Sequence, residues 1–171
     1  VVTQPDRPAG RGQRVHQSAV KQFALNNGLE ILQPASLRDP ESVASIARFT
    51  PNLIVVAAFG QILPQPVLEL PQYGCVNVHA SLLPRWRGAS PIQYAIRAGD
   101  TESGVTIIKM DAGLDTGPIL ESAKVAIEPA ETGISLHDKL AVLSGELLPD
   151  TLRAFVDGGI VPLPQSDKDA T

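Results

Sequence analysis

The chain has 171 residues, of which 43% are hydrophobic and 19% are charged; this composition excludes a disordered chain and fits one globular domain. Its net charge of −4 at pH 7 does not indicate a nucleic-acid binder. No apolar run approaches the roughly 20 residues that a membrane helix needs, and the N-terminus has no basic segment followed by a hydrophobic stretch. We therefore expect a cytoplasmic protein without a membrane partner.

The first half of the chain opens on a polar segment. Residues 3–12 (TQPDRPAGRG) contain two prolines and two glycines among charges, which predicts an exposed loop. Apolar residues recur at helical spacing over 17–27, and 29–32 is a short apolar strand. The next helix is expected to begin with Asp39 as its N-cap and Pro40 in its first turn.

The second half alternates strands with helices. In chain order we predict strands over 53–59, 75–78, 105–110 and 119–127, a short helix or turn over 64–70, and helices over 91–98 and 135–156. This alternation predicts an α/β fold, with a mostly parallel Rossmann-like sheet, right-handed crossovers and helices on both faces.

Two further expectations follow from this fold. Ligands of such sheets bind beyond the carboxyl ends of the strands, so the loops after Phe59, Val78 and Met110 should share one rim. Residues 161–171 have the composition of a linker, so we take residues 1–160 as the folded domain.

Positive charge is concentrated near the N-terminus. The first 21 residues carry Arg7, Arg11, Arg14 and Lys21 against Asp6 alone, whereas the other 150 residues hold 10 basic and 17 acidic side chains. The segment from Arg7 to Arg14 is therefore a basic arm on an acidic body. By composition alone, a solvated loop without a partner explains it.

The only cysteine of the chain is Cys75, inside an apolar run. A single cysteine cannot form a disulfide within the chain, which agrees with a reducing compartment. We expect a buried structural thiol rather than a nucleophile.

A pair of polar residues, Asn77 and His79, lies at the end of the buried strand that begins near Cys75. Since side chains alternate along a strand, Val78 can point into the sheet while both polar side chains point to its other side. An isolated pair of this kind is more often a satisfied core histidine beside a turn former, so it does not by itself indicate a site.

The segment that follows, residues 81–91 (SLLPRWRGASP), is dense in special residues. Pro84 and Gly88 fix the path of a loop whose backbone can hydrogen-bond to a flat polar ring. The charged and aromatic residues between them, Arg85, Trp86 and Arg87, could equally form a nucleic-acid patch.

Residues 110–117 (MDAGLDTG) form the third polar element. Glycines beside acidic residues are typical of calcium loops, but the spacing does not match an EF-hand and no carboxylate cluster accompanies it, so we expect no metal. Either Asp111 or Asp115 could instead pair with His79.

Together these motifs resemble a known family. NVHASLLPRWRGASPIQ at 77–93 and MDAGLDTGPI at 110–119 are similar to the folate-dependent formyltransferases, and TQPDRPAGRG at 3–12 resembles those members that formylate initiator methionyl-tRNA. The similarity covers nearly the whole chain. It implies the formyltransferase fold and an N-terminal catalytic domain that lacks the family's first strand and helix, and also lacks its C-terminal β-barrel.

The resemblance implies that Asn77, His79 and Asp115 are the catalytic residues. In such enzymes an uncharged amine attacks the formyl group of 10-formyltetrahydrofolate, and a tetrahedral centre with an oxyanion forms. Asn77 and His79 would donate hydrogen bonds to that oxygen. Asp115 would orient His79 and help to relay the proton of the amine. Neither a covalent intermediate nor a metal is required.

The resemblance also implies binding residues. The folate pocket would be lined by Phe59, Gly60, Ile62, Leu63, Ser81, Leu82, Leu83, Pro84, Gly113 and Leu114. For Phe59 and Leu63, plain core packing is an equally good explanation. In the basic arm, Arg7, Arg11 and Arg14 would contact phosphates or unpaired bases of initiator methionyl-tRNA.

The acceptor of the formyl group is the open point at this stage. The leading hypothesis is the amino group of initiator methionyl-tRNA, acted on by a monomer. The alternatives are an amino sugar, water in a formyl-folate hydrolase module, or a truncated domain that binds folate without turnover.

Overall fold

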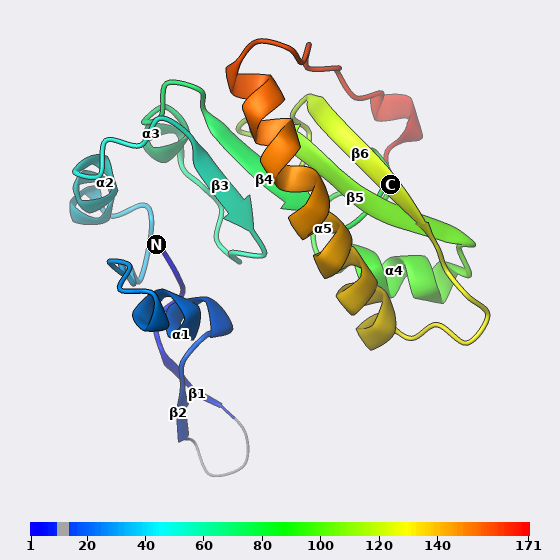
Figure 1. Cartoon of the computed structure of the whole chain (residues 1–171), viewed down its shortest axis with the longest axis horizontal. Helices are drawn as coiled ribbons and strands as arrows, with labels where there is room; N and C mark the ends of the chain where they lie inside the picture. Colours follow the sequence, from blue (N-terminus) through cyan, green and yellow to red (C-terminus); the bar gives the residue numbers. More distant parts are fainter. Residues whose placement is uncertain (10–13) are drawn as a thin grey trace. The chain divides into compact units, whose positions relative to one another are not determined.

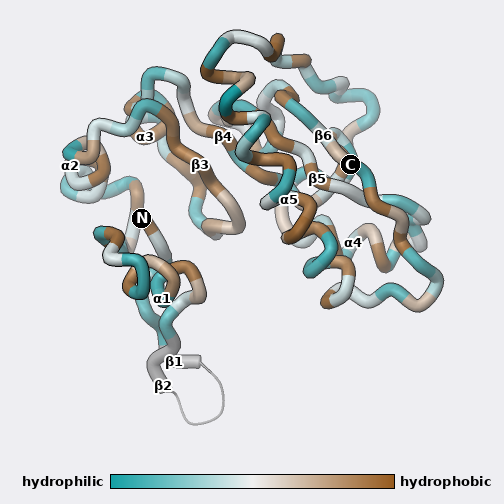
Figure 2. The backbone as a smooth tube through the Cα atoms, in the orientation of Figure 1, coloured by the Kyte–Doolittle hydropathy of each residue, from teal (hydrophilic) through white to brown (hydrophobic). Residues whose placement is uncertain are grey.

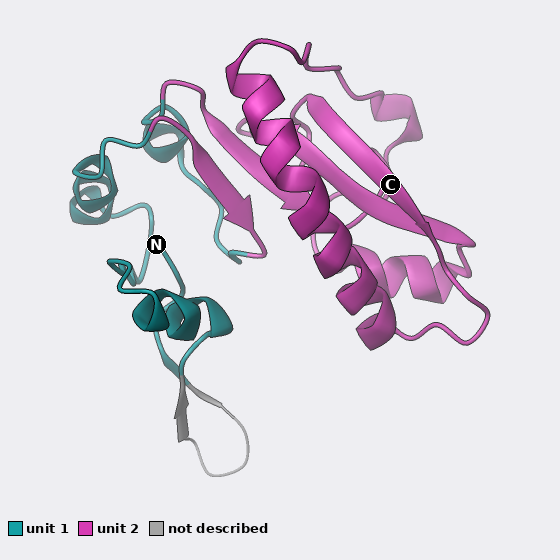
Figure 3. Cartoon of the chain, in the orientation of Figure 1, with its two compact units in different colours: residues 1–51, 59–71 teal, residues 52–58, 72–171 magenta. Residues whose placement is uncertain are grey.

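The computed structural model describes residues 1–9 and 14–171, and side chains other than those of residues 8–16. These residues form two compact units (Figure 3). The first contains residues 1–51 and 59–71, and the second contains residues 52–58 and 72–171. All four strands of the larger sheet belong to the second unit.

A short hairpin and three helices make up the first unit. Strands β1 (Arg7–Ala9) and β2 (Arg14–His16) pair antiparallel, and they are followed by α1 (Ala19–Asn26), α2 (Pro40–Ala47) and α3 (Gln65–Leu68) (Figure 1). The hairpin occupies part of the segment for which we expected a loop. Each of its strands is only three residues long, which is too short for an apolar alternation to mark it in the sequence.

Side-chain caps set the starts of α1, where Ser18 accepts from Lys21 N, and of α2. Asp39 accepts a hydrogen bond from Glu41 N at 3.2 Å, and Pro40 lies in the first turn, so the expected start of α2 is confirmed. The strand expected over 29–32 is reduced to one parallel bridge between Val2 and Leu32, in which Leu32 N donates to Val1 O at 2.8 Å.

The sheet of the second unit is mixed. Its strands, in spatial order, are β3 (Ile54–Ala57), β4 (Cys75–His79), β5 (Glu102–Lys109) and β6 (Ile119–Ala126) (Figure 1). Only β3 and β4 are parallel, whereas the β4–β5 and β5–β6 pairs are antiparallel. The expected α/β class is therefore right, but "mostly parallel" is wrong for these four strands.

The reason for the antiparallel direction lies in the connection between β4 and β5. This connection contains α4 (Pro91–Ala98), and such a helix often returns the chain for a parallel strand. Here Arg85 and Trp86, just after β4, both hydrogen-bond to Asp100, just before β5. The chain thus re-enters the sheet at the end where β4 left it, and β5 must run the other way.

The core of the second unit lies between the sheet and α5 (Gly133–Val156). Val105 and Ile107 of β5 are fully buried, with Leu136 and Leu140 of α5 packed on the first of them. Brown and teal segments alternate along α5 in Figure 2, as expected for a helix with one apolar face.

Helix α4 packs on the same face, because its Ile92 and Ile96 join the cluster around Val105. Within this unit the helices therefore cover one face of the sheet rather than both. The other face carries the polar residues of β4 and the loops that follow. None of the helices in the described part of the chain is both long and apolar enough to cross a bilayer.

Candidate active site

Strand β4 sends alternate side chains to opposite faces of the sheet. Val76 and Val78 pack against the core on the α5 side, so Cys75, Asn77 and His79 face the other way. Asn77 is half-buried, and His79 is only 6% exposed. The expectation that these two polar side chains share one face is confirmed.

The carboxylate of Asp115 joins this pair from the loop between β5 and β6. Its Oδ1 accepts a hydrogen bond from Asn77 Nδ2 at 3.0 Å, and its Oδ2 lies 3.4 Å from His79 Nδ1. The backbone N–H of Gly88 donates to the same Oδ2 at 2.9 Å. One carboxylate therefore links β4, the loop after β4 and the loop after β5.

We had expected the loop that carries Asp115 to share a rim with the loop after β4, and this expectation is wrong. In the antiparallel β4–β5 pair, Lys109 lies opposite Val76, whereas His79 lies opposite Thr106. Strand β5 thus ends at the beginning of β4. The loop must fold back over the sheet face to bring Asp115 against Asn77, and the site lies on that face rather than beyond the strand ends.

Asp111, the other acidic residue of this loop, holds the loop itself together. Its Oδ1 accepts hydrogen bonds from Gly113 N at 2.9 Å and from Thr116 Oγ1 at 2.7 Å. Asp115 has a backbone φ of 53°, in the left-handed region that non-glycine residues seldom adopt. A Cβ on Gly117 would lie 1.9 Å from Lys109 O, so the loop closes tightly on β5.

The two ring nitrogens of His79 have different neighbours. Nε2 lies 2.8 Å from the carbonyl oxygen of Trp86, and a carbonyl oxygen only accepts, so Nε2 carries a hydrogen in this arrangement. Nδ1 is then the nitrogen on the side of Asp115. In the neutral ring its lone pair faces the site, and after protonation it can donate to the carboxylate.

The loop after β4 is held by its own hydrogen bonds. Ser81 Oγ donates to Arg85 O at 2.6 Å. Thr106, fully buried on β5, donates to Ser81 O at 2.7 Å and accepts from Leu83 N at 3.0 Å. The backbone of the loop is thereby fixed against β5.

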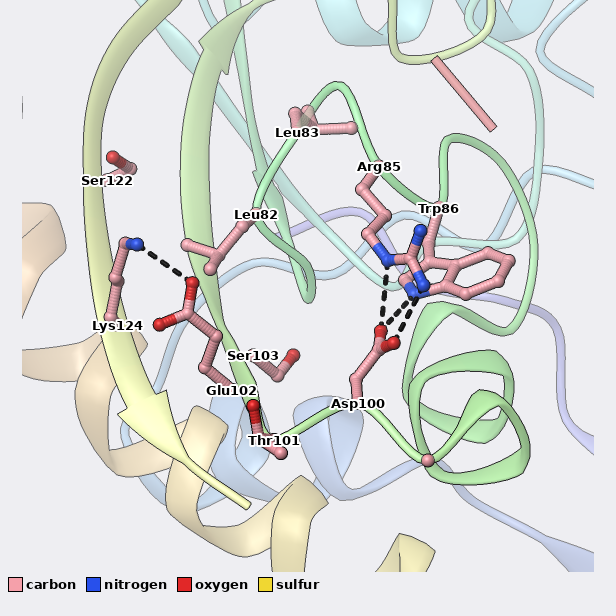
Figure 4. A pocket seen from close by; sticks show the side chains of 11 residues that line it. Leu82, Leu83, Arg85, Trp86, Asp100, Thr101, Glu102, Ser103, Ser122 and Lys124 are labelled. Atoms are coloured by element: carbon pink, nitrogen blue, oxygen red, sulfur yellow. Dashed lines mark hydrogen bonds and ion pairs between the residues drawn. The ribbon is translucent and has the colours of Figure 1, made fainter. Parts of the chain in front are cut away.

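Arg85 and Trp86 serve the loop in the same way. Arg85 forms two hydrogen bonds with Asp100, at 2.7 and 3.0 Å, and Trp86 Nε1 donates to the same carboxylate at 2.8 Å (Figure 4). The hydrogen bond from Arg85 lowers the pKa of Asp100. The Trp86 ring also stacks on Tyr94 at 5.4 Å. Arg87 is bonded to Gln165 and Asp167, so contacts inside the protein account for all three residues that could have formed a nucleic-acid patch.

A cavity of about 620 Å³ lies beside this cluster (Figure 4). It is lined by Leu82, Leu83, Arg85, Trp86, Gly99, Asp100, Thr101, Glu102, Ser103, Ser122 and Lys124. Its charged groups are already paired, Lys124 with Glu102 and Arg85 with Asp100. None of the three residues that meet at Asp115 lines it, so this cavity is distinct from their meeting point.

The residues expected to bind folate fall in both units. Phe59, Gly60, Ile62 and Leu63 belong to the first unit, where Ile62 is 68% exposed and Leu63 is buried. Packing within the protein thus accounts for Leu63, one of the two residues for which we weighed core packing against binding; Phe59, the other, is half-buried.

The other expected folate residues belong to the second unit, with the catalytic candidates. Ser81 and Leu83 are buried, and Leu82 and Pro84 are half-buried. In the opposite loop Gly113 and Leu114 are exposed. Leu114 is 63% exposed and also approaches Gly88, where an added Cβ would lie 2.9 Å from Leu114 Cδ2.

The basic arm is described only in part. Arg7 is exposed, and its guanidinium donates to Gln4 Oε1 at 3.3 Å. Arg14 contributes backbone to β2, whereas its side chain and the whole of Arg11 lie outside the described residues.

Cys75 lies on the same sheet face as His79, but it is only 1% exposed. Burial raises the pKa of its thiol to about 11, so at neutral pH the sulfur stays protonated. A buried thiol was expected here. The described residues contain no group of three or more His, Cys, Asp or Glu side chains placed to hold a metal ion.

Sequence reasoning missed two residues that shape this site. Gln165 hydrogen-bonds to the backbone of the loop that carries Asp115, and Thr106 fixes the loop after β4. Gln165 lies in the segment for which we predicted only a linker. Both act through contacts with residues that are distant in the sequence, and no local sequence pattern predicts such contacts.

The sequence of the chain is similar to those of known formyltransferases. A family model described as Formyl transferase matches residues 1–152. The methionyl-tRNA formyltransferases of Aromatoleum aromaticum and Stutzerimonas stutzeri are each 54% identical to this chain over 171 residues, which is 100% of the chain and 54% of either relative. The chain thus spans about half the length of the curated relatives it matches.

Two solved formyltransferase structures share this fold. Phosphoribosylglycinamide formyltransferase from Bacillus halodurans is 26% identical, with a TM-score of 0.77 over 92% of this chain and 80% of that one. Glycinamide ribonucleotide transformylase 1 from Geobacillus kaustophilus is 29% identical, with a TM-score of 0.69 over 80% and 76% of the two chains.

Proposed function

The chain belongs to the formyl transferase family, and on that premise we propose that it transfers the formyl group of 10-formyltetrahydrofolate to the amino group of initiator methionyl-tRNA. The observation that carries the proposal is the meeting of Asn77, His79 and Gly88 N around the carboxylate of Asp115. Acyl transfer is accelerated by hydrogen-bond donors and by a base, and a carboxylate can hold both in place.

The residues around the carboxylate fit the folate donor. Such a donor presents a flat heteroaromatic ring and supplies an electrophilic formyl carbon. Leu114 offers exposed apolar surface in the loop beside Asp115, and Leu82 offers partly exposed surface in the loop after β4. Apolar walls around a few converging polar groups are the usual composition of a small-molecule site.

Asn77 is the residue best placed to stabilise negative charge on the formyl oxygen. One hydrogen of its amide is held by Asp115 Oδ1. Among the described residues, that nitrogen makes no second hydrogen bond, so its other hydrogen can donate to an incoming oxygen. Because Asp115 fixes the orientation of the amide, this donor is in place before the reaction begins.

His79 is the residue best placed to accept the proton of the attacking amine. Its Nε2–H is held by the Trp86 carbonyl, which leaves Nδ1 as the basic nitrogen. When Nδ1 takes the proton, the imidazolium lies 3.4 Å from Asp115 Oδ2 and can be stabilised by that charge. We therefore assign proton transfer to Nδ1, rather than the donation to the oxyanion that the resemblance implied for His79. Nδ1 takes the proton of the attacking amine and passes one to the departing N10 nitrogen of the folate. The Trp86 carbonyl orients the neutral ring, and Asp115 accepts from Nδ1–H once the imidazolium has formed.

Support for a tRNA acceptor comes from two sources. The relatives at 54% identity carry the name methionyl-tRNA formyltransferase, whereas the structures of glycinamide ribonucleotide enzymes cited above share 26–29% identity. The basic arm also concentrates Arg7, Arg11 and Arg14 in a chain whose net charge is negative. Local positive charge is what binding to phosphates requires.

A comparison of rates with different acceptors tests the proposal. The protein is incubated with 10-formyltetrahydrofolate and one of four acceptors: initiator methionyl-tRNA, a nucleotide-linked amino sugar, glycinamide ribonucleotide or water alone. We expect formyl transfer to the tRNA to exceed transfer to either small amine by a factor on the order of 10³ or more. Faster transfer to a small amine, or release of formate without an acceptor, would overturn the assignment.

A further inference from the structure

The last residues of the second unit run along the site. This C-terminal strap, residues 161–171, begins next to β6, where Leu163 and Ile119 exchange two backbone hydrogen bonds of 2.8 Å. At the other end, Thr171 bonds to the loop after β4: its Oγ1 accepts from Trp86 N at 2.9 Å, and its carbonyl accepts from Arg87 N at 3.0 Å. The strap is thus fixed to β6 and to the loop after β4.

One side chain of the strap contacts both loops that form the site. The amide nitrogen of Gln165 donates to Asp115 O at 2.8 Å and to Gly117 O at 2.7 Å. Its amide oxygen accepts from Arg87 Nε at 3.0 Å. Both hydrogens of this amide group are therefore used, for carbonyls 50 and 48 residues away in the sequence, and its oxygen accepts from a side chain 78 residues away.

These bonds complete a closed ring of contacts. Gln165 holds the backbone of Asp115, the carboxylate of Asp115 accepts from Gly88 N, and Gly88 follows Arg87, which is itself held by Gln165. Within this ring, Asp115 has a φ of 53°, a conformation that its own sequence does not favour. A contact from outside the loop is the kind of support that such a backbone needs.

We propose that Gln165 is a positioning residue for formyl transfer: by holding the carbonyls of Asp115 and Gly117 it fixes the Asp115 carboxylate against Asn77 and His79. This inference rests on the proposed function. Because the amide of Gln165 is bonded within the protein, its role is to act through Asp115 rather than on a substrate. Its effect is on rate, because small displacements of a catalytic group reduce the rate of an oriented reaction while leaving binding intact.

Gln165→Glu tests the contact to the Asp115 loop. The carboxylate keeps an acceptor for Arg87 but loses both hydrogens that Asp115 O and Gly117 O require. We expect kcat for formyl transfer to fall by about 10-fold to 100-fold while KM for 10-formyltetrahydrofolate stays within about twofold. Asp167→Asn is the matched control, since Asp167 also contacts Arg87 but is 87% exposed, and its kcat should not change.

A double-mutant cycle with Asp115→Asn separates positioning from general damage. If Gln165 acts through Asp115, adding Gln165→Glu to Asp115→Asn should lower kcat by less than about threefold further. Thermal unfolding of each variant identifies any that fails to fold, and Gln165→Met, which removes all three hydrogen bonds, provides a second measurement of the same loss.

The outcomes separate the two proposals. Full additivity in the cycle, or wild-type kcat in Gln165→Glu, would overturn the positioning role while leaving the proposed function intact. A wild-type kcat in Asp115→Asn would instead overturn the proposed function.

Discussion

The loops around Asp115 and the basic arm differ in how far their polar groups are already bonded within the protein. The Asp115 carboxylate contacts Asn77, His79 and Gly88, and the backbone carbonyl of Asp115 accepts a hydrogen bond from Gln165. In the arm, exposed Arg7 makes one 3.3 Å hydrogen bond to a neighbouring glutamine.

This difference corresponds to two kinds of task. Transfer of a group requires donors and bases fixed before the substrate arrives, because reorganisation during the reaction raises the barrier. Attraction of a charged partner requires exposed charge, and its strength depends little on the geometry of any one contact. Substitutions in the two regions should therefore change different kinetic parameters.

Replacing His79 gives the largest expected effect. His79→Ala removes the base and one of the groups that face Asp115, so we expect kcat to fall by about 10² to 10³. Single-turnover kinetics at saturating substrates measures this loss. His137→Ala is the control, because His137 is 67% exposed and lies on the far helix. A loss below about threefold in His79→Ala would mean that the hydrogen-bonded residues around Asp115 have only a structural role.

Crowding the loop that carries Asp115 should give the next largest effect. A Cβ on Gly117 would lie 1.9 Å from Lys109 O, so Gly117→Ala should lower the free energy of unfolding by about 1 to 3 kcal/mol and kcat by about tenfold. Denaturant unfolding and initial rates measure the two quantities. At Gly145, in α5, an added Cβ would meet no atom of another part of the protein within 4 Å, so Gly145→Ala should stabilise the protein slightly.

In the basic arm a smaller and more selective effect is expected. Arg11→Ala should lower kcat/KM for initiator methionyl-tRNA by about five- to tenfold, leave KM for the folate donor unchanged, and reduce the salt dependence of tRNA binding by about one ion. Arg38→Ala removes the same charge from an exposed position outside the arm and serves as the control. Equal loss for both substrates would contradict the assignment of the arm.

The smallest effect is expected at Cys75, which shares a sheet face with His79. Because burial raises its pKa to about 11, the thiol stays protonated at any pH below about 10, and its ionisation cannot shape the rate between pH 6 and 9. Cys75→Ala should therefore keep kcat within about twofold of the wild type. Its pH–rate profile should superpose on that of the wild type, and a missing limb in the variant would show that the thiol takes part.

Local chemistry in the sequence was sufficient to predict most of the elements and part of the site. Asp39 and Pro40 mark the start of α2, Pro91 and Gly99 bound α4, and alternation along β4 places Asn77 and His79 on one face. These features depend on residues within one or two turns of each other, and caps, fixed φ angles and side-chain periodicity are local properties.

Only the tertiary structure decided the rest. It reversed β5 through the contacts of Asp100 and folded the Asp115 loop back across the sheet. It also brought Gln165 to a carbonyl 50 residues earlier in the chain. Such contacts join groups that are distant in sequence and leave no periodic pattern. They depend on how the whole backbone folds, so local sequence cannot predict them.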